Sequence, residues 1–324
     1  MPPAGYAVPM QAVFDVVLPV FGIIIAGFVC GRTGVLGQDS SDALNRYVYW
    51  VALPALLFVG MARVPIGAIF NLPFLAAYLL GVAGIAAVAV AVARVAFPGN
   101  ATQLTLGALS ATFANTGYMG IPLFITAFGN DGTLPAVIAT VINAAVMIGG
   151  AIAIIEAGQA GAAGLATGLG RAGRALMTNP LVLGPAAGIL ASALGVPIPK
   201  ALGVFCDLLG ASAGPCALFA VGLFLASQSA TALVGGRRAV EAGWLTLLKL
   251  VGQPALTLVL ARAFGLDAFW AFSAALLSGL PTGALSFVLA QQYKNYVVRA
   301  SAVILASTVL SAVTLSVMLV WLRP

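Results

Sequence analysis

Two long apolar stretches of the chain are interrupted by the same short pattern, at Gly120-Ile121-Pro122 and at Gly279-Leu280-Pro281. Amide and hydroxyl side chains flank the two interruptions: Asn115, Thr116, Thr282 and Ser286. A helix broken at such a point exposes backbone N–H groups, which suit an anion, and carbonyl groups, which suit a cation or a hydrogen-bond donor. These residues indicate ligand binding, and a simple kink in a packed helix is the alternative for either pattern alone.

The four flanking side chains differ in what they can bind. The Asn115 amide can donate to a carboxylate or accept a hydrogen bond, and its alternative role is to cap the helix that follows the break. Thr116, Thr282 and Ser286 can add hydroxyl groups to a binding site. Alternatively, each hydroxyl can bond to the preceding turn of its own helix.

Two further polar residues lie within apolar stretches. Lys249 carries a charge that is costly to insert into a membrane unless it faces a cavity or a partner. It either neutralises an anionic substrate directly or holds backbone carbonyl groups at the breaks as a fixed cation, and the second role is favoured. Asn143 either faces the same cavity or forms a hydrogen bond between helices.

The acidic residues are few, and their positions limit the transport chemistry. Asp15 and Asp207 lie in apolar stretches and are candidate carriers of a coupling proton, although hydration near a membrane face is the alternative. Glu156 is predicted to be solvated at the end of its helix. Neither 100–130 nor 268–293 contains Asp or Glu, which disfavours a sodium/proton antiporter with an aspartate pair. Sodium binding through carbonyl and amide oxygens stays open.

Histidine is absent, which excludes His-based catalytic triads, His-containing zinc sites and haem attachment. Ser-Lys pairs exist in principle, but an intramembrane enzyme is the weakest interpretation. The three cysteines, Cys30, Cys206 and Cys216, are odd in number on apolar segments and predict packing roles rather than disulfides. We therefore expect no enzyme activity, no cofactor and no metal site.

The composition predicts the elements that must position these residues. The chain of 324 residues is 62% hydrophobic and 7% charged, with a mean hydropathy of +1.11, whereas soluble domains carry about 25% charged residues. It is predicted to be an all-α membrane protein, because only helices or closed barrels satisfy their backbone groups in a bilayer. Ten apolar segments are long enough to span: 10–30, 41–62, 71–95, 101–128, 133–157, 179–196, 201–227, 240–264, 268–292 and 298–321.

The spacing of prolines indicates an internal repeat. Pro19 and Pro54 are 35 residues apart, and so are Pro180 and Pro215, which places the second pair 161 residues after the first. The prolines of the two Gly-apolar-Pro patterns are offset by a similar 159 residues. Coincidence is the alternative, but it must explain several matches in register.

Residues 1–157 and 179–324 are therefore read as two five-helix units, with a Gly/Ala-rich connection at 158–178. Because five is odd, the second unit enters the membrane from the opposite face and the repeat is inverted. The fourth and ninth helices, each broken by a Gly-apolar-Pro pattern, are then expected to cross near mid-membrane.

The distribution of positive charge predicts the orientation. The first apolar segment lacks a basic region before it, so a cleaved signal peptide is not expected. Nine cationic residues fall on one side: Arg32, Arg46, Arg94, Arg171, Arg174, Arg237, Arg238, Lys294 and Arg299. Four fall on the other: Arg63, Lys200, Arg262 and Arg323. The first side is predicted to be cytoplasmic, with both termini outside, and the net charge of +6 then reflects topology rather than nucleic-acid binding.

The residues around the breaks resemble a known family. The stretch Asn115-Thr116-Gly117-Tyr118-Met119-Gly120-Ile121-Pro122-Leu123 is similar to the NTxxMGIPL signature of the auxin efflux carrier family. Residues 280–293, which begin Leu280-Pro281-Thr282-Gly283 and end Gln292-Tyr293, resemble that family's LPxGxxxFVxAxxY stretch. Asn179-Pro180 at the start of the sixth helix and Lys249 ahead of Pro254 also fit.

The resemblance implies a fold like that of bile-acid/sodium symporters, in which helices 1, 2, 6 and 7 form a scaffold and helices 3–5 and 8–10 form a moving transport domain. It implies dimerisation through the scaffold and places Asn115 at the substrate site. Family members carry carboxylates, such as auxin in plants and malonate or malate in bacteria. Plant members usually have prolines where this chain has Ala114 and Ser286, and a long cytoplasmic loop that is short here. A bacterial-type small acid is therefore favoured over auxin.

The leading hypothesis is a secondary transporter in the cell inner membrane that moves a small mono- or dicarboxylate by elevator-type alternating access. A sodium-coupled symporter of a larger amphipathic anion and a non-transporting membrane sensor are the alternatives. The lipid bilayer, the small carboxylate and a second copy of the chain are the expected partners. The candidate substrate-binding residues are Asn115, Thr116, Gly120, Pro122, Asn143, Pro281, Thr282 and Ser286, with Lys249 balancing charge and Asp15 and Asp207 as candidate coupling residues.

Overall fold

The computed structural model describes the backbone of most of the chain: residues 9–64, 67, 70–129, 132–159, 170, 173–174, 177–227 and 236–321. The side chains of 9–17, 38 and 321 are outside this description. Most of the predicted connection at 158–178 also lies outside it.

The described part of the chain is helical throughout and contains no β-strand. Six helices are long and apolar enough to cross a membrane: Asp39–Ala62, Leu72–Ala96, Leu134–Gln159, Lys200–Ser227, Gly236–Ala263 and Val297–Val320. Shorter apolar helices accompany them: Leu18–Arg32, Thr116–Phe128, Pro180–Ala193 and Ala268–Ser278. The predicted all-helical class is confirmed, and these helices have the length and apolar composition of membrane spans.

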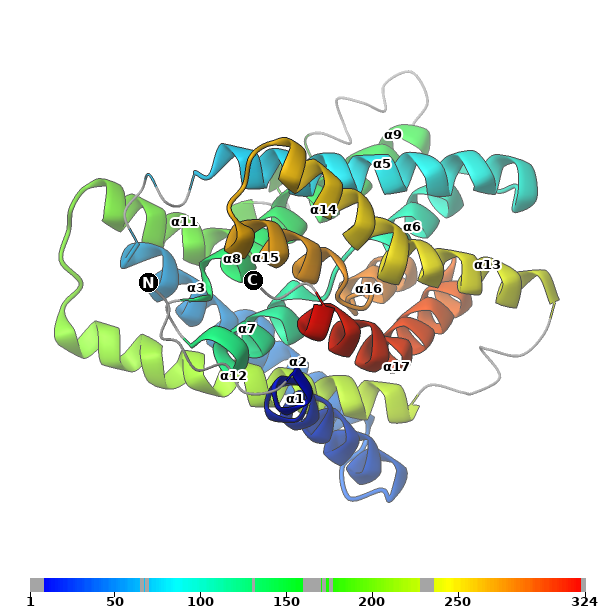
Figure 1. Cartoon of the computed structure of the whole chain (residues 1–324). Helices are drawn as coiled ribbons and strands as arrows, with labels where there is room; N and C mark the ends of the chain where they lie inside the picture. The colour runs from blue at the N-terminus through cyan, green and yellow to red at the C-terminus, as the bar shows by residue number, and fades with distance from the viewer. Residues whose placement is uncertain are drawn as a thin grey trace.

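One group of helices packs around α12. Its members are α1 (Pro9–Arg32), α2 (Gln38–Tyr47), the π-helical turn η1 (Val48–Ala52), α3 (Leu53–Ala62), α11 (Pro180–Ala193) and α12 (Lys200–Ser227). Within the group, α1 lies along α12 and α11 lies along α3. Figure 1 shows α12 and α1 along one side of the molecule, opposite α5 and α9.

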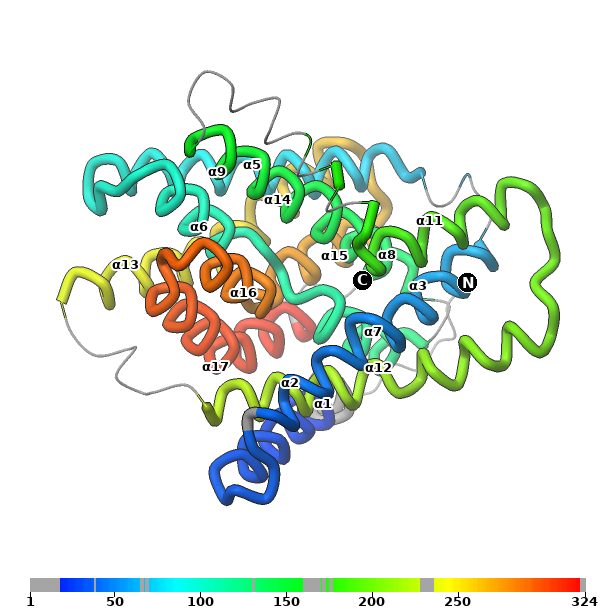
Figure 2. The backbone as a smooth tube through the Cα atoms, turned by 180° about the vertical axis from the view of Figure 1, so that it is seen from behind, coloured from blue at the N-terminus to red at the C-terminus, as the bar shows by residue number. Residues whose placement is uncertain are grey.

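The remaining elements form a second group. They are α5 (Leu72–Ala96), α6 (Ala101–Thr112), η2 (Thr116–Gly120), α7 (Ile121–Phe128), α8 (Leu134–Ile142), η4 (Asn143–Ile148), α9 (Gly149–Gln159), α13 (Gly236–Leu247), η7 (Leu248–Gly252), α14 (Gln253–Ala263), α15 (Ala268–Ser278), α16 (Leu285–Gln292) and α17 (Val297–Trp321). In this group α5 packs on α14 and α6, and α14 packs on α15. α15 and α16 lie between α5 and α12 in both views (Figure 1, Figure 2).

Glycines allow the helices of the first group to approach closely. A Cβ atom on Gly27 of α1 would lie 2.2 Å from the carbonyl oxygen of Phe219 in α12, and one on Gly188 of α11 would lie 2.3 Å from that of Phe58 in α3. No side chain fits at such distances, so these contacts require glycine. Gly27 and Gly188 are 161 residues apart, as are Phe58 and Phe219, which equals the interval between the proline pairs.

Three prolines are accommodated within continuous helices by π-helical turns. Pro54, Pro122 and Pro254 each lie two residues after a π turn, η1, η2 and η7 respectively. A proline lacks an N–H group and its ring collides with the carbonyl group four residues earlier in a regular α-helix. The wider π turn moves that carbonyl group aside, so the helix continues past the proline.

We predicted from the sequence that the first broken helix is interrupted at its Gly-apolar-Pro pattern. The break lies earlier in the chain. The chain leaves the helix at Phe113, is extended at Ala114 and re-enters a helix at Thr116, so residues 120–122 are helical. The prediction was wrong because η2 absorbs Pro122 within the second half-helix. The second break lies where predicted, between Ser278 at the end of α15 and Leu285 at the start of α16.

Candidate functional site

The two broken helices meet in the centre of the molecule at a short pair of extended segments, residues 113–115 and 281–283, which we call the crossover. Ala114 and Thr282 form an antiparallel bridge. The Asn115 N–H donates to the Pro281 carbonyl oxygen at 2.9 Å, and the Gly283 N–H donates to that of Phe113 at 2.9 Å. The backbone groups freed by one break are therefore partly satisfied by the other, as an apolar surrounding requires.

Thr282 ties the crossover to its neighbours with both its backbone and its side chain. Its N–H donates to the Ser307 hydroxyl oxygen of α17 at 3.0 Å, and its own hydroxyl donates to the Ser110 carbonyl oxygen of α6 at 2.7 Å. The Ser286 hydroxyl donates to the Gly283 carbonyl oxygen at 2.8 Å. The hydroxyl groups of Thr282 and Ser286 thus support the crossover backbone in this conformation.

Asn143, the first residue of η4, is hydrogen-bonded to the other side of the crossover. Its amide nitrogen donates to the Ala114 carbonyl oxygen at 2.9 Å and to the Thr116 hydroxyl oxygen at 3.1 Å. Its amide oxygen accepts a hydrogen bond from the Tyr78 hydroxyl of α5 at 3.3 Å. The structure therefore brings Asn143 to the crossover, where it links three helical segments.

Lys249 lies behind the crossover and is 0% exposed. Its Nζ donates to the Ser278 carbonyl oxygen at 2.5 Å and to Gln253 Oε1 at 2.6 Å. Gln253 in turn donates from Nε2 to the Thr112 carbonyl oxygen at 3.1 Å. Ser278 and Thr112 are the last helical residues before the two breaks, so Lys249 and Gln253 together hold both carbonyl ends.

Asn115 differs from its neighbours because its side chain makes no hydrogen bond within the described part of the chain. It occupies the N-cap position of η2 without a side-chain capping bond, and it is 9% exposed. The capping role that the sequence left open is thus absent here. An unpaired amide beside the positive end of a half-helix is a suitable binding group for an anion.

The remaining predicted residues of the first half-helix face other elements. A Cβ atom on Gly120 would lie 2.8 Å from the Leu280 side chain, so Gly120 lets the two broken helices approach. Pro122 packs on α12, where a Cβ atom on Gly214 would lie 3.1 Å from its ring. Pro122 therefore lies at the boundary between the two groups of helices.

The candidate coupling residues lie away from this site. Asp207 is half-exposed and forms a two-bond ion pair with Arg63, with both N···O distances 2.8 Å. The pair lines a cavity of about 350 Å³ that also contains Lys200, at the junction of α3 and α12. The side chain of Asp15 lies outside the described residues. The structure thus does not bring Asp207 to the crossover.

The sequence analysis missed several residues of the site. Gln253 lies four residues after Lys249 on the same helix face, and this spacing was the available signal. Nothing in the sequence indicated Tyr78 or Ser307.

Glu156, which we predicted to be solvated, is 8% exposed and accepts a hydrogen bond from Tyr293 at 2.9 Å. Among the described residues, no group of three His, Cys, Asp or Glu side chains is placed to hold a metal ion.

Comparison with known proteins gives a consistent picture. Residues 12–167 and 169–319 match the model of a family described as "Membrane transport protein". A protein of Rhizobium meliloti (strain 1021) named "Putative malonate transporter" is 31% identical over 316 residues, which are 97% of each chain. "Uncharacterized transporter YfdV" of Escherichia coli (strain K12) is 24% identical over 283 residues, which are 86% of this chain and 88% of that protein. The relatives bear the names of transporters and not of enzymes.

Proposed function

The chain belongs to the auxin efflux carrier family of membrane transport proteins, and from this premise we propose that it is a secondary transporter of a small mono- or dicarboxylate such as malonate. The observation that carries the proposal is the unpaired Asn115 amide at the crossover. The name of the Rhizobium meliloti relative supports the substrate class. We place the protein in the cell inner membrane, with both termini outside.

We propose that the substrate carboxylate binds between the Asn115 amide and the backbone N–H groups of Gly117 and Tyr118, because the N–H group of Thr116 already donates to the Ala114 carbonyl oxygen at 2.8 Å. The first N–H groups of a helix have no partner within it and carry partial positive charge. Lys249 adds a nearby positive charge and fixes the carbonyl groups of Ser278 and, through Gln253, of Thr112, so that these oxygens do not repel the anion. Lys249 thus acts mainly as a fixed structural cation.

The charge of the crossover favours an anion over a metal cation or a proton as cargo. Neither 100–130 nor 268–293 contains an acidic residue, whereas carboxylate oxygens are the preferred ligands of hard cations. Lys249 is buried without an acidic partner among the described residues. A site with one buried cation and no carboxylate attracts an anion, because the anion offsets the buried charge.

We further propose that the chain is a ten-helix inverted repeat that works as an elevator. The first group of helices, α1–α3 with α11 and α12, is the scaffold, and the second group, α5–α9 with α13–α17, is the moving unit. Gly188 follows Gly27 by 161 residues, and Phe219 follows Phe58 by the same number. Because the two residue pairs make equivalent contacts, this common offset supports the repeat within the scaffold. Pro122 lies where the moving unit would slide along α12. A homodimer formed through the scaffold would hold it against this motion.

Replacing Asn115 by alanine tests the site. A hydrogen bond to a charged group is worth about 1.5–3 kcal/mol, so the KM for malonate counterflow in proteoliposomes is expected to rise about tenfold or more. Asn45→Ala on α2 is the matched control, because its amide donates to Ser41 on the same helix at 3.4 Å, and its KM should stay at the wild-type value. An unchanged KM in Asn115→Ala would remove this residue from the site.

The same proteoliposomes test the function as a whole. Wild-type protein is expected to exchange short mono- or dicarboxylates, and flux with and without a sodium gradient separates this function from a sodium-coupled symporter of larger amphipathic anions. If no organic acid in a broad panel is exchanged, the transporter proposal is wrong. Tight binding without counterflow would indicate a sensor.

A further inference from the structure

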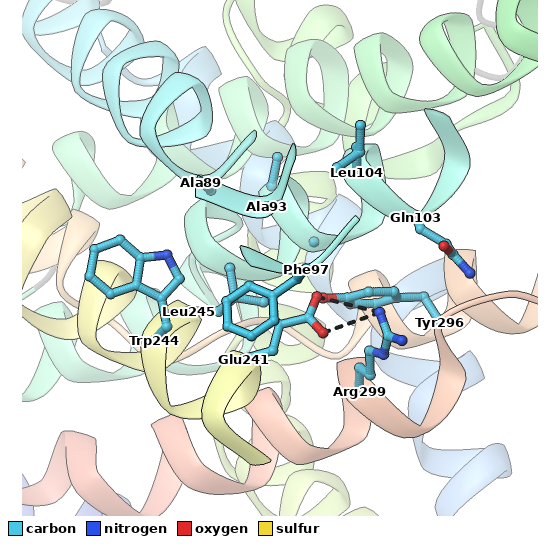
Figure 3. A pocket seen from close by; sticks show the side chains of 12 residues that line it. Ala89, Ala93, Phe97, Gln103, Leu104, Glu241, Trp244, Leu245, Tyr296 and Arg299 are labelled. Atoms are coloured by element: carbon cyan, nitrogen blue, oxygen red, sulfur yellow. Dashed lines mark hydrogen bonds and ion pairs between the residues drawn. The ribbon is translucent and has the colours of Figure 1, made fainter. Parts of the chain in front are cut away.

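A buried carboxylate lies in the moving unit, outside the crossover. Glu241 of α13 is 5% exposed and accepts a hydrogen bond from the Tyr296 hydroxyl at 2.5 Å. Arg299 of α17 forms an ion pair with it, with an N···O distance of 3.1 Å. Figure 3 shows Glu241 pointing toward both partners from the opposite helix. One carboxylate is thus shared between the start of α17 and the residue before it.

The surroundings of this carboxylate strengthen its bonds. The Arg299 guanidinium lies over the Tyr296 ring, 5.1 Å from its centroid. A cavity of about 10 Å³ adjoins the group and is walled mainly by apolar side chains, including Phe97, Trp244 and Leu245. Such a volume holds about one water molecule. In this weakly polarisable environment, paired polar groups interact strongly and unpaired ones are costly.

A second tyrosine of the same connection bonds to a second buried carboxylate. Tyr293 donates to Glu156 Oε1 at 2.9 Å, and Glu156 belongs to α9 in the first half of the chain. The segment Tyr293–Tyr296, which joins α16 to α17, is therefore tied to α9 and to α13 by two Tyr–Glu hydrogen bonds. We call this segment with Glu156, Glu241 and Arg299 the brace.

The backbone of the brace adopts a conformation that requires such support. Lys294 has a φ of 48° and Tyr296 a φ of 63°, and these are the two non-glycine residues with positive φ among the described residues. Lys294 and Asn295 donate to the carbonyl oxygens of Gln291 and Ala290, both at 3.0 Å, which closes the end of α16. Left-handed non-glycine residues persist where surrounding contacts over-determine them, commonly at functional sites.

One short helix connects the brace to the crossover. α16 spans only eight residues, Leu285–Gln292, and begins just after Thr282 and Gly283. Its far end continues directly into Tyr293. Because a short helix moves as a rigid rod, its position at the crossover depends on where the brace holds its other end.

We propose that the brace positions the second crossover segment for substrate binding, with Tyr296, Glu241 and Arg299 as positioning residues that act through α16. This inference rests on the proposed transport function. It makes the affinity for substrate depend on hydrogen bonds that touch no substrate. The brace also joins the two halves of the chain, so α9, α13 and α16 are held as one body within the moving unit.

Two conservative variants test the brace by transport. Tyr296→Phe and Glu241→Gln keep the shape of the cluster and remove a donor or a charge, and each is expected to raise the KM for malonate counterflow about threefold to tenfold with little change in maximal rate. Tyr49→Phe is the matched control, because its hydroxyl bonds Asn179 at 3.1 Å inside the scaffold. A lower yield of folded protein with a wild-type KM would reduce the brace to a purely structural role and overturn the proposal.

Hydrogen–deuterium exchange provides a second measurement that needs no substrate. Backbone amides of 281–292 are expected to exchange faster in Tyr296→Phe than in wild type by about threefold or more, because the brace no longer holds α16. In Tyr49→Phe this segment should exchange at the wild-type rate. Unchanged exchange in Tyr296→Phe contradicts the brace, whereas faster exchange in a protein that moves no carboxylate contradicts only the transport function.

Discussion

Replacing Lys249 by methionine is expected to abolish carboxylate counterflow while leaving a folded protein. The substitution keeps the length of the apolar stem but removes the ammonium group that donates to Ser278 and Gln253. Each buried oxygen left without a donor costs about 1–3 kcal/mol. Removal of the buried ammonium offsets part of this loss, because burying a charge is itself costly. The carbonyl end of α15 then loses its fixed cation, and the crossover loses the charge that favours an anion.

The experiment compares Lys249→Met with Lys200→Met, the same change at an exposed lysine. Both proteins are purified, their thermal unfolding is followed in detergent, and malonate counterflow is measured in proteoliposomes. Lys200→Met should transport like wild type. Substantial counterflow by Lys249→Met would show that the cation is unnecessary for transport. A protein that fails to fold would show that its main role is in stability.

A methyl group at Gly27 or Gly188 is expected to destabilise the protein by about 3 kcal/mol, at the upper end of the usual cost of overpacking. Each Cβ atom would lie within 2.3 Å of a backbone oxygen, and a backbone cannot turn away as a side chain can. Two packed helices must therefore separate. We expect Gly27→Ala and Gly188→Ala to lower the unfolding temperature by similar amounts, since the contacts are equally close.

Gly22→Ala is the control for this pair. Gly22 lies on the same helix as Gly27, but nothing approaches within 4 Å of a Cβ atom placed there. Its unfolding temperature should stay near that of wild type, or rise slightly because alanine favours the helix. Equal unfolding temperatures for Gly27→Ala and Gly22→Ala would mean that the close contact with Phe219 is absent in the folded protein.

The class of fold was predictable because apolar segments of about twenty residues form helices in a bilayer. The positions of the breaks were less so. Gly279-Leu280-Pro281 does interrupt a helix, whereas Gly120-Ile121-Pro122 does not, although the two patterns look alike in sequence. The difference is the π turn η2, Thr116–Gly120, which precedes Pro122. Local pattern cannot reveal whether a proline breaks a helix or is absorbed by it.

The site was predictable where it depends on residue type, and unpredictable where it depends on distant partners. A lysine within an apolar helix predicts a buried side chain with polar partners, and Lys249 is fully buried. Glu156 looked like an ordinary helix-end residue because its partner Tyr293 lies 137 residues away in sequence. The Ser307 bond to Thr282 had no local signal either. Such contacts depend on the tertiary fold, and the spacing of residues in the sequence does not reveal them.

The π turn at η7 has a consequence for how the chain tolerates changes in length. A π turn holds one residue more than an α turn over the same path, so deleting one residue among 250–252 would close η7 into a regular α-helix. Because the helix would keep the same path, side chains outside the turn would keep their faces, and only those within η7 would change direction. Gln253 would still face Thr112, whereas Lys249 lies within η7 and would change its direction relative to Ser278. The place of the cation behind the crossover therefore depends on the length of this one turn.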